Sequence, residues 1–597
     1  MSFATPIRDI HFALKHMAGF ERLIATGAYE DLSGELLEAI VEELARFCDN
    51  EIAPMNWTSD QQGATLANGA VTPTPGMKQL HQQYVEGGWG TLSFPASVGG
   101  QNLPTTMAVA ACEAVNAACM SYGLCPMLTS GATKAVMHAG SEEQKKIYLE
   151  KMVTGEWTGT MNLTEPQAGS DLSGIRTKAE PLGDGRYKIS GQKIYITWGD
   201  HDMTENIVHL VLARLPNAPE GTGGISMFLV PKFHVNADGT LGERNDAYAV
   251  GLEEKLGAHG SPTCVMAFGD NGNCIGTLLG EENRGLANMF VMMNSARLDV
   301  GAQAVGVAER SFQRALAYAQ ERRQGRAPGV RTGEQIPIYQ HADIRRTLFL
   351  MKAMTEAARG ICYANGVAHD LAISAPDEES RKDAKTLDAL LTPISKAWSS
   401  DRANEITSMG VQVHGGMGFV EETKAAQHMR DVRICGIYEG TNGIQAIDLV
   451  GRKLQGDGGS GARKFIALAR TSVTALEETN DQTFLKIASM LKNACNALEL
   501  STNYLLQKAA DNQHQDILAG ASAYLQQFGN VAGGHYFATG VLSLMAAGDT
   551  DPQWLESKKA LLKIYSDNIL AEAVSLGAAV RSGSDTLQPF DASILSS

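Results

Sequence analysis

The sequence lacks the features that mark membrane, secreted and disulfide-bonded proteins. Its 597 residues contain no run of 18 or more apolar residues, so we expect no transmembrane helix. The first nine residues, MSFATPIRD, have no basic start followed by an apolar stretch, so no signal peptide is expected. The nine cysteines are scattered and never spaced as Cys-x-x-Cys, which predicts reduced thiols and neither a disulfide framework nor a metal site. These absences favour a soluble, cytoplasmic protein.

Positive charge is also in short supply. The chain has 50 Lys and Arg against 66 Asp and Glu, for a net charge of −16, and no basic block stands out. A nucleic-acid partner held through many phosphate contacts is therefore disfavoured. A few local arginines would still suffice to hold a small anionic molecule.

What remains is the composition of a globular chain with more than one core. Hydrophobic residues make up 44% and charged residues 19%, as in ordinary globular proteins. A chain of 597 residues is too long for one core and predicts three to five domain-sized pieces.

Hydrophobic periodicity separates helical from strand-rich parts. Residues 3–27 look like a helical extension, and residues 33–52 predict an amphipathic helix. The polar residues 57–76, with Gly and Pro, predict a loop, and helical pattern returns over 77–152. From Thr158 the pattern changes to short strands separated by turn residues, which predicts a compact β domain. Its expected strands include residues 187–189, 193–197, 207–213, 225–230 and 265–268.

Long helices return in the second half of the chain, at residues 300–321, 342–364 and 384–409. The glycine-rich residues 456–461 are the clearest hinge. Beyond it, residues 465–587 read as helical and mildly acidic, with eight Lys or Arg against twelve Asp or Glu. The order of helices, β domain, helices and helical tail predicts an α+β fold with segregated layers.

Two short segments carry the chemistry. The first, TEPQAGSD at residues 164–171, is a turn whose backbone N–H groups suit an anionic cofactor. The second, IYEGT at residues 437–441, places one carboxylate between an aromatic residue and a glycine. Together they suggest a cofactor that accepts electrons and a base that removes a proton. Each pattern alone is weak, because short glycine-containing motifs recur by chance.

Five ordered segments resemble the acyl-CoA dehydrogenases over essentially the whole chain. They are NLTEPQAGSD (162–171), GQKIYIT (191–197), ERRQGR (321–326), QVHGGMG (412–418) and IYEGT (437–441). Five motifs in order are far more specific than any one of them. The Arg-rich turn, the N-terminal extension and the tail further resemble the larger bacterial subgroup, which includes 3-methylmercaptopropionyl-CoA dehydrogenases and some long-chain enzymes.

The resemblance implies a fold in which FAD and an acyl-CoA thioester lie between three domains. The expected segments are an N-terminal extension (1–35), a helical N-terminal domain (36–157), a middle β-barrel domain (158–285), a C-terminal four-helix-bundle domain (286–455) and an extra helical C-terminal domain (462–597).

The expected reaction converts a saturated acyl-CoA into the trans-2-enoyl-CoA. It needs a base for the α proton and a cofactor for the β hydride, here flavin N5, because no amino acid accepts hydride. A carboxylate with a raised pKa suits the base, and Glu439 is the candidate. Its N–H also suits holding the thioester carbonyl. Some relatives carry the base on the helix through residues 292–297, where this chain has Ala296.

The resemblance also implies contact residues. Those for FAD are Met161, Leu163, Thr164, Gly169, Ser170, Ile196, Thr197, Arg322, Gln324, Gln412, Gly415, Gly416 and Thr441. Those for the substrate are Ser170, Arg297, Tyr438 and Gly440. Thr164 and Thr197 would touch the N5 side of the flavin ring. Arg322 and Gln324 would cross a homodimer to the neighbouring FAD's phosphates, a task that suits a bidentate, permanently charged side chain.

Each of these residues also has a plainer interpretation. The two threonines fit ordinary strand preference, and Arg322 fits a solvated helix end. Arg297 fits a buried ion pair with Asp299 or another acid, and His414 fits a packed ring with no catalytic role. Two positions depart from the family pattern: Tyr195 stands where many relatives have Trp, and Gly443 where many have Gln.

The leading hypothesis is an FAD enzyme that passes electrons to an electron-transfer flavoprotein. Its substrate would be 3-methylmercaptopropionyl-CoA or a short- or medium-length straight-chain acyl-CoA, since a thioether is nearly isosteric with a methylene. Two alternatives stay open. One is an acyl-CoA oxidase that uses O2, and the other is a DNA-associated flavoprotein, against which the acidic tail argues.

Overall fold

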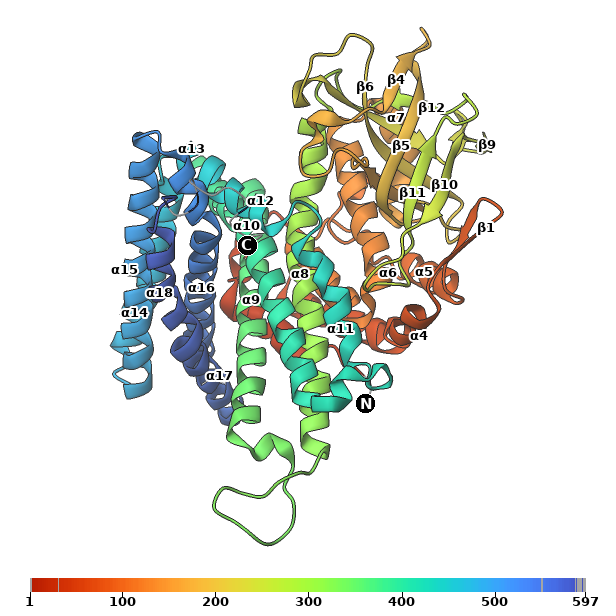
Figure 1. Cartoon of the computed structure of the whole chain (residues 1–597). Coiled ribbons are helices and arrows are strands. Elements are labelled where there is room, and N and C mark those ends of the chain that lie inside the picture. The colour runs from red at the N-terminus through yellow and green to blue at the C-terminus, as the bar shows by residue number, and fades with distance from the viewer. Residues whose placement is uncertain (1–2, 30–31, 549–550, 586, 588–592, 594–597) are drawn as a thin grey trace. The chain divides into compact units, whose positions relative to one another are not determined.

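The computed structural model of the chain describes residues 3–29, 32–548, 551–585, 587 and 593 (Figure 1). The ends of the expected N-terminal extension and C-terminal domain therefore lie outside the described residues. The chain forms two compact units. Among the described residues, the sheet unit comprises those within 3–5 and 43–299, and the bundle unit comprises those within 6–42 and 300–593.

An eight-stranded mixed sheet is the centre of the sheet unit. Its order is β10-β11-β5-β12-β7-β6-β3, and β4 pairs with both β5 and β6. The β3–β6 and β4–β6 pairs are parallel and the others antiparallel. The strands are β3 (Trp157–Asn162), β4 (Lys178–Pro181), β5 (Arg186–Thr197), β6 (Asn206–Arg214), β7 (Ile225–Pro231), β10 (Ala247–Leu252), β11 (Thr263–Phe268) and β12 (Ile275–Leu278).

Every strand expected from periodicity is present, but two of the expected strands are parts of one continuous strand. The expected strands at 187–189 and 193–197 form the single strand β5, which pairs with β12 and β4 along its first half and with β11 along its second. The chain passes between the halves at Gly191, where a β-carbon would lie 2.5 Å from Thr177 Oγ1. Glycine therefore permits an approach that any other residue would block.

The segment at residues 57–76 is not the loop that its polarity predicted. It contains helix α4 (Met55–Gln62) and a hairpin of β1 (Thr65–Ala67) and β2 (Ala70–Thr72). Asn68 and Gly69, between these strands, have φ values of 52° and 72°. The Asn-Gly pair supplies the two positive φ angles that a two-residue hairpin turn needs. A second hairpin joins β8 (Phe233–Val235) to β9 (Leu241–Arg244).

Helix α6 (Thr105–Ala139) packs against the sheet beside α5 (Met77–Glu86) and α7 (Glu142–Thr154). It is bent at Cys119, whose φ and ψ are −158° and 101°, and it contains Pro126. Within the described residues, α6 is the one helix long and apolar enough to cross a membrane, with a mean hydropathy of 1.3 over its most apolar window. Because 89% of that window is buried in the protein, α6 reads as a core helix.

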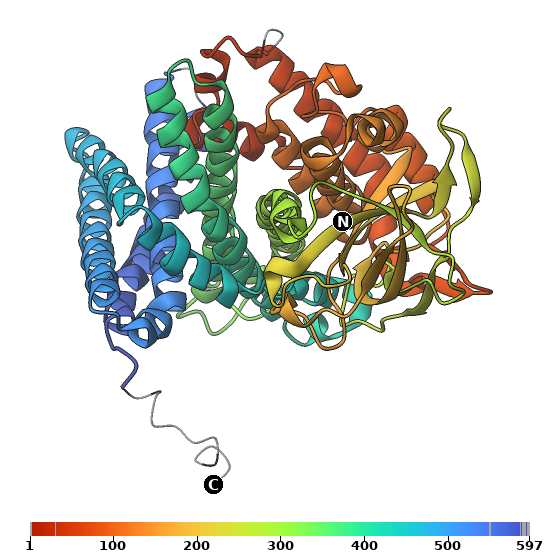
Figure 2. The same cartoon turned by 90° about the horizontal axis from the view of Figure 1, so that it is seen from above.

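The bundle unit is built from long helices, as expected (Figure 2). Helix α8 (Gly285–Glu321) begins in the sheet unit and enters the bundle unit at Val300. The expected C-terminal helices pack on α9 and α10, and Figures 1 and 2 show them in blue beside those green helices. The helices are α1 (Ile7–Phe12), α2 (Glu21–Ile24), α9 (Ala342–Ser374), α10 (Glu378–His414), α11 (Ala425–Val432), α12 (Asn442–Asp448), α13 (Leu454–Gly456), α14 (Ser460–Glu478), α15 (Gln482–Ala510), α16 (His514–Ala546), α17 (Pro552–Tyr565) and α18 (Ala571–Val580); α3 (Gly34–Phe47) crosses the boundary between the units.

Five buried charges and the half-buried Lys352 join the N-terminal extension and the last helices to the bundle. Lys558 on α17 contacts Asp9 of α1 at 2.8 Å and Glu356 of α9 at 3.0 Å. Lys352 on α9 also contacts Asp9, at 2.5 Å. Glu309 and Arg359 complete a cluster of three acids and three bases. The extension and the tail are thus parts of the bundle unit.

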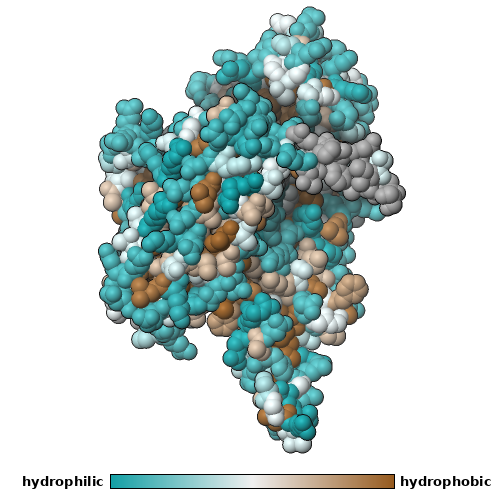
Figure 3. All heavy atoms as spheres, turned by 60° about the vertical axis from the view of Figure 1, so that its left-hand side comes forward, coloured by the Kyte–Doolittle hydropathy of each residue, from teal (hydrophilic) through white to brown (hydrophobic). Residues whose placement is uncertain are grey.

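The face formed by the last helices is mostly hydrophilic, with scattered apolar spots (Figure 3). Single exposed apolar side chains of this kind are normal on a protein surface.

Candidate active site

The TEPQAGSD segment leaves strand β3 as a tight turn. Glu165 and Ala168 exchange backbone hydrogen bonds of 3.0 and 2.9 Å. The carbonyl of Thr164 accepts a 2.9 Å bond from the N–H of Ile194 on β5. The first two motifs, more than twenty residues apart in sequence, therefore lie side by side.

A buried ion pair stabilises this turn. Lys193 is fully buried, and its Nζ donates to Glu165 Oε1 at 2.8 Å and to the Leu163 carbonyl at 3.0 Å. Glu165 also accepts from Thr177 Oγ1 at 2.6 Å and from the N–H of Arg176 at 2.6 Å. Burial alone would raise the pKa of Glu165, but Lys193 and these hydrogen bonds lower that pKa to about 2. The carboxylate is therefore ionised and holds the turn.

Around this turn, polar groups face outward and apolar groups are packed. Thr164 and Thr197 are half-buried, while Gly169 and Ser170 are exposed. The side chain of Ile196 lies in the core cluster of the sheet, so any contact it makes with a cofactor must come from its backbone. Met161 is half-buried and Leu163 is 8% exposed.

Tyr195 has an uncommon backbone for its size. Its φ is +62°, and its side chain is 60% exposed although it lies between the strand residues Ile194 and Ile196. Bulky residues rarely adopt positive φ, and such strain tends to gather where a ligand binds. The aromatic ring expected beside the flavin is therefore accessible from outside the sheet.

In the bundle unit, Glu439 lies in a left-handed turn just before helix α12. Its φ is +57° and that of Gly440 is +83°. The Glu439 side chain is half-buried. Thr441 caps α12, because its Oγ1 accepts a 3.3 Å bond from Ile444 N–H. The hydroxyl expected to contact FAD thus already stabilises the helix start.

The Gln412–Gly416 segment ends helix α10. Gly415 has a φ of +61°, and a β-carbon on Gly415 or Gly416 would meet no atom within 4 Å. There is therefore space for a ligand to approach the backbone of this segment closely. The segment lies at the carbonyl end of the helix, however, so the helix dipole opposes a phosphate there. His414 is a packed ring, stacked on Tyr318 with 4.5 Å between the ring centroids.

Arg322 and Gln324 lie together on an exposed hairpin between α8 and α9, where Arg322 Nη2 donates to Gln324 Oε1 at 3.1 Å. Backbone bonds from Gln324 to Ile336 and from Ile338 to Arg322 order the hairpin. Arg297, by contrast, is 3% exposed and donates to Asn294 on its own helix at 3.2 Å. Its guanidinium is therefore engaged inside the sheet unit.

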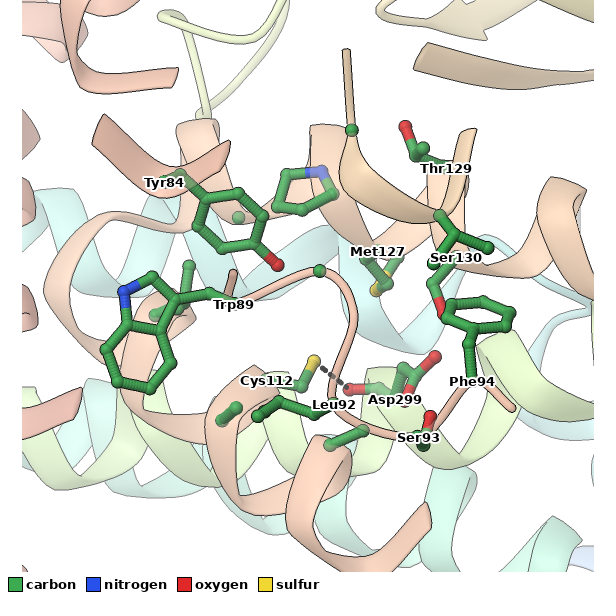
Figure 4. Close-up of a pocket in the computed structure, with 18 of the residues that line it drawn as sticks. Tyr84, Trp89, Leu92, Ser93, Phe94, Cys112, Met127, Thr129, Ser130 and Asp299 are labelled. Carbon is green, nitrogen blue, oxygen red and sulfur yellow. Dashed lines mark hydrogen bonds between the residues drawn. The ribbon is translucent and has the colours of Figure 1, made fainter. Parts of the chain in front are cut away.

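A pocket opens beside helix α6 in the sheet unit (Figure 4). The pocket is partly open to solvent. In Figure 4 the Tyr84 ring and the Met127 side chain border it, and Cys112 Sγ donates to the Asp299 carbonyl at 3.6 Å. Its apolar walls include Trp89 and Phe94.

Among the described residues, none of the FAD- and substrate-binding candidates lines this pocket. The pocket still adjoins strand β3, which leads to the TEPQAGSD turn. Thr129, on its wall, accepts a 3.1 Å bond from the N–H of Gly159 on β3, two residues before Met161. Sequence reasoning missed it because no motif marks a cavity whose walls come from α5, α6 and α8.

The residues of the sheet unit fit an FAD. The side of the turn at Gly169 is open, since a β-carbon there would meet nothing within 4 Å. The half-buried hydroxyls of Thr164 and Thr197 and the accessible Tyr195 ring supply hydrogen bonds and an aromatic surface. These groups suit a flat, polar-edged ring bound against the sheet edge.

Comparisons with known proteins identify the family of the chain. The descriptions "Acyl-CoA dehydrogenase, N-terminal domain", "middle domain" and "C-terminal domain" match residues 35–156, 160–270 and 283–454. "Acetyl-CoA dehydrogenase C-terminal like" matches residues 463–591. The chain therefore belongs to the acyl-CoA dehydrogenase family. It is an FAD-dependent oxidoreductase that dehydrogenates acyl-CoA thioesters.

Individual members of the family are also similar to this chain. The chain is 44% identical over 589 residues to the 3-methylmercaptopropionyl-CoA dehydrogenase of Ruegeria pomeroyi, covering 98% of this chain and 99% of that one. It is 37% identical to a butyryl-CoA dehydrogenase of Syntrophomonas wolfei over 77% of both chains. The acyl-CoA dehydrogenase of Bacillus anthracis solved with FAD shares the fold, with a TM-score of 0.74, 22% identity and coverage of 94% and 90%.

Proposed function

We propose that this enzyme oxidises 3-methylmercaptopropionyl-CoA, or a short- or medium-length straight-chain acyl-CoA of similar size, with Glu439 as the α-proton base. The observation that carries the proposal is the 44% identity to a 3-methylmercaptopropionyl-CoA dehydrogenase over nearly the full length of both chains. The left-handed, half-buried Glu439 turn supports the choice of base.

Two groups of this chain perform the steps that belong to the protein. The Glu439 carboxylate takes the α proton, and its half-buried position shields it in part from water. The Thr164 turn and Tyr195 would hold and orient the cofactor. Bound FAD supplies the two-electron acceptor that the amino acids lack.

The pocket beside α6 is proposed to receive the end of the acyl group. It adjoins β3 through the Thr129–Gly159 bond and combines the apolar walls of Trp89, Phe94 and Met127 with polar groups. Because polar side chains share the wall with apolar ones, a long, wholly aliphatic chain would find apolar contacts along only part of the pocket. A short acyl chain that carries a polarisable thioether sulfur near its end fits the pocket better.

The electron acceptor and the assembly are also proposals. Reoxidation by an electron-transfer flavoprotein follows from the family, with O2 as the competing acceptor. A homodimer is supported by an apolar group at the end of α10 and on α11: Met417, Phe419, Val420 and Met429 are 49%, 91%, 40% and 46% exposed. Contiguous exposed apolar side chains mark protein interfaces. A cytoplasmic location fits nine free thiols.

The test is kcat/KM with butyryl-, hexanoyl-, octanoyl-, palmitoyl- and 3-methylmercaptopropionyl-CoA. The proposal predicts that the methylmercaptopropionyl and short straight-chain thioesters lead, and that palmitoyl-CoA is poorest. A preference for palmitoyl-CoA would contradict it. Anaerobic reduction by substrate, followed by the rate of reoxidation in air and with electron-transfer flavoprotein, separates the dehydrogenase from the oxidase.

A further inference from the structure

The turn that carries Glu439 is held by side chains from outside the IYEGT motif. Glu439 and Gly440 are consecutive left-handed residues, with φ of +57° and +83°. A left-handed conformation is unfavourable for a residue that has a β-carbon, so it persists only where its surroundings impose it. The position of the carboxylate therefore depends on whatever anchors the two peptide carbonyls of this turn.

Lys396 is the main anchor. It lies on α10 and is completely buried. Its Nζ donates to the Gly440 carbonyl at 2.9 Å and to Asn442 Oδ1 at 2.8 Å. A charged donor makes a stronger hydrogen bond than a neutral one, and a buried donor has no water to replace it.

Gln445 and Asn442 complete the arrangement. Gln445, also completely buried, donates from Nε2 to the carbonyls of Glu439 at 3.3 Å and Gly440 at 3.2 Å. Asn442 donates to Asp401 Oδ1 at 2.6 Å and to Ser400 Oγ at 3.0 Å, both on α10. Helix α10 thus determines where the turn lies through Lys396 and Asn442.

We propose that Lys396 is a positioning residue for the α-proton base: it holds the Gly440 carbonyl so that Glu439 keeps its left-handed backbone and its carboxylate stays directed at the substrate. This inference rests on the proposed role of Glu439. Lys396 touches neither cofactor nor substrate in this account and acts only through the turn. Misplacing a reacting group by about 1 Å costs about 100-fold in rate.

The test uses the full-length, FAD-loaded enzyme with Lys396→Met, which keeps the apolar stem and removes the ammonium. Ser395→Ala is the matched control, because Ser395 is its neighbour on α10, is equally buried, and bonds to Asn365 on α9 at 3.0 Å. The limiting rate of flavin reduction is measured anaerobically by stopped flow, and FAD content and the Kd for the enoyl-CoA product are measured alongside.

We expect Lys396→Met to reduce flavin about 10- to 100-fold more slowly, with FAD content and product Kd within about threefold of wild type. Ser395→Ala should match wild type. In a Glu439→Gln background, Lys396→Met should slow reduction by less than threefold further, because a residue that acts through the carboxylate has nothing left to position. A general loss of structure would instead slow both backgrounds equally.

A wild-type rate in Lys396→Met, or an equal loss in both backgrounds, overturns the inference. If Lys396→Met fails to fold, Gln445→Leu decides it by the same two comparisons, since Gln445 also donates to the Gly440 carbonyl that Lys396 holds. The outcome is separable from the proposed function. Fast reduction by Glu439→Gln alone would remove the base assignment, whereas slow Glu439→Gln with fast Lys396→Met removes only this inference.

Discussion

Replacing Glu165 by Gln should weaken both the sheet unit and its hold on FAD. The carboxylate accepts bonds from Lys193, from Thr177 and from the N–H of Arg176, at 2.6 to 2.8 Å. The amide has nearly the same shape but leaves the fully buried Lys193 ammonium without a counter-charge. Removing one partner of a buried pair costs about 3–5 kcal/mol, and we expect the free energy of unfolding to fall by about this amount.

The effect on FAD follows from the same geometry. Lys193 donates to the Leu163 carbonyl, next to Thr164. Loss of one charge-assisted bond to the turn, about 1.5–3 kcal/mol, corresponds to about 10- to 100-fold weaker FAD binding if the turn relaxes. Chemical denaturation followed by fluorescence measures the stability, and flavin fluorescence titration of the apoprotein measures the Kd.

Two further variants make the reasoning refutable. In Glu165→Gln/Lys193→Met both charges are gone, so the double variant should be more stable than Glu165→Gln alone. Glu156→Gln breaks a surface pair with Lys151 (3.3 Å) and should change stability by less than about 1 kcal/mol. If Glu165→Gln is as stable as Glu156→Gln and binds FAD like wild type, the buried pair does not hold the turn.

Three other variants test the rest of the molecule. Lys558→Met should lower the thermal midpoint of unfolding, because it removes a positive charge that contacts Asp9 and Glu356. Adding Asp9→Asn should recover part of the loss, and no recovery would contradict a stabilising role for the charge cluster. Burial lowers the pKa of His535 to about 4. As pH falls from about 6.5 toward 4, the unfolded state therefore binds a proton that the folded state does not, and the free energy of unfolding falls by about 1.4 kcal/mol per pH unit. In urea titrations at several pH values, His535→Asn should remove this contribution to the pH dependence, and an unchanged pH dependence would refute the assignment. Phe419→Asp should turn the proposed homodimer into monomers in light scattering, and an intact dimer would show that the exposed apolar group at residues 417–420 is not the interface.

Local pattern was enough to predict most of the fold. Long runs with helical spacing gave α8, α9 and α10, and the turn-separated apolar runs gave β6, β7 and β11. The failure at residues 57–76 came from treating polarity as a loop signal. The Asn68-Gly69 pair there is a hairpin signal that outweighs the polar composition around it.

The sequence predicted only those parts of the candidate site that belong to a motif. The sequence singled out Glu439 and the Thr164 turn, but it gave no hint that Lys193 and Lys396 support them. Those lysines lie 28 and 44 residues from the groups they contact, and only the paths of β5 and α10 bring them there. Alternation could not place Ile196 either, because the register of β5 shifts between Lys193 and Ile196, where Tyr195 has a positive φ.

Rapid anaerobic mixing of Glu439→Gln with saturating 3-methylmercaptopropionyl-CoA tests the central claim most directly. The amide keeps the shape of the turn, so FAD content and acyl-CoA binding should match wild type. Flavin reduction should slow by at least about 10²–10⁴-fold, the usual contribution of a general base, while Glu439→Asp keeps some activity. Flavin reduction by Glu439→Gln at the wild-type rate would show that another group removes the α proton.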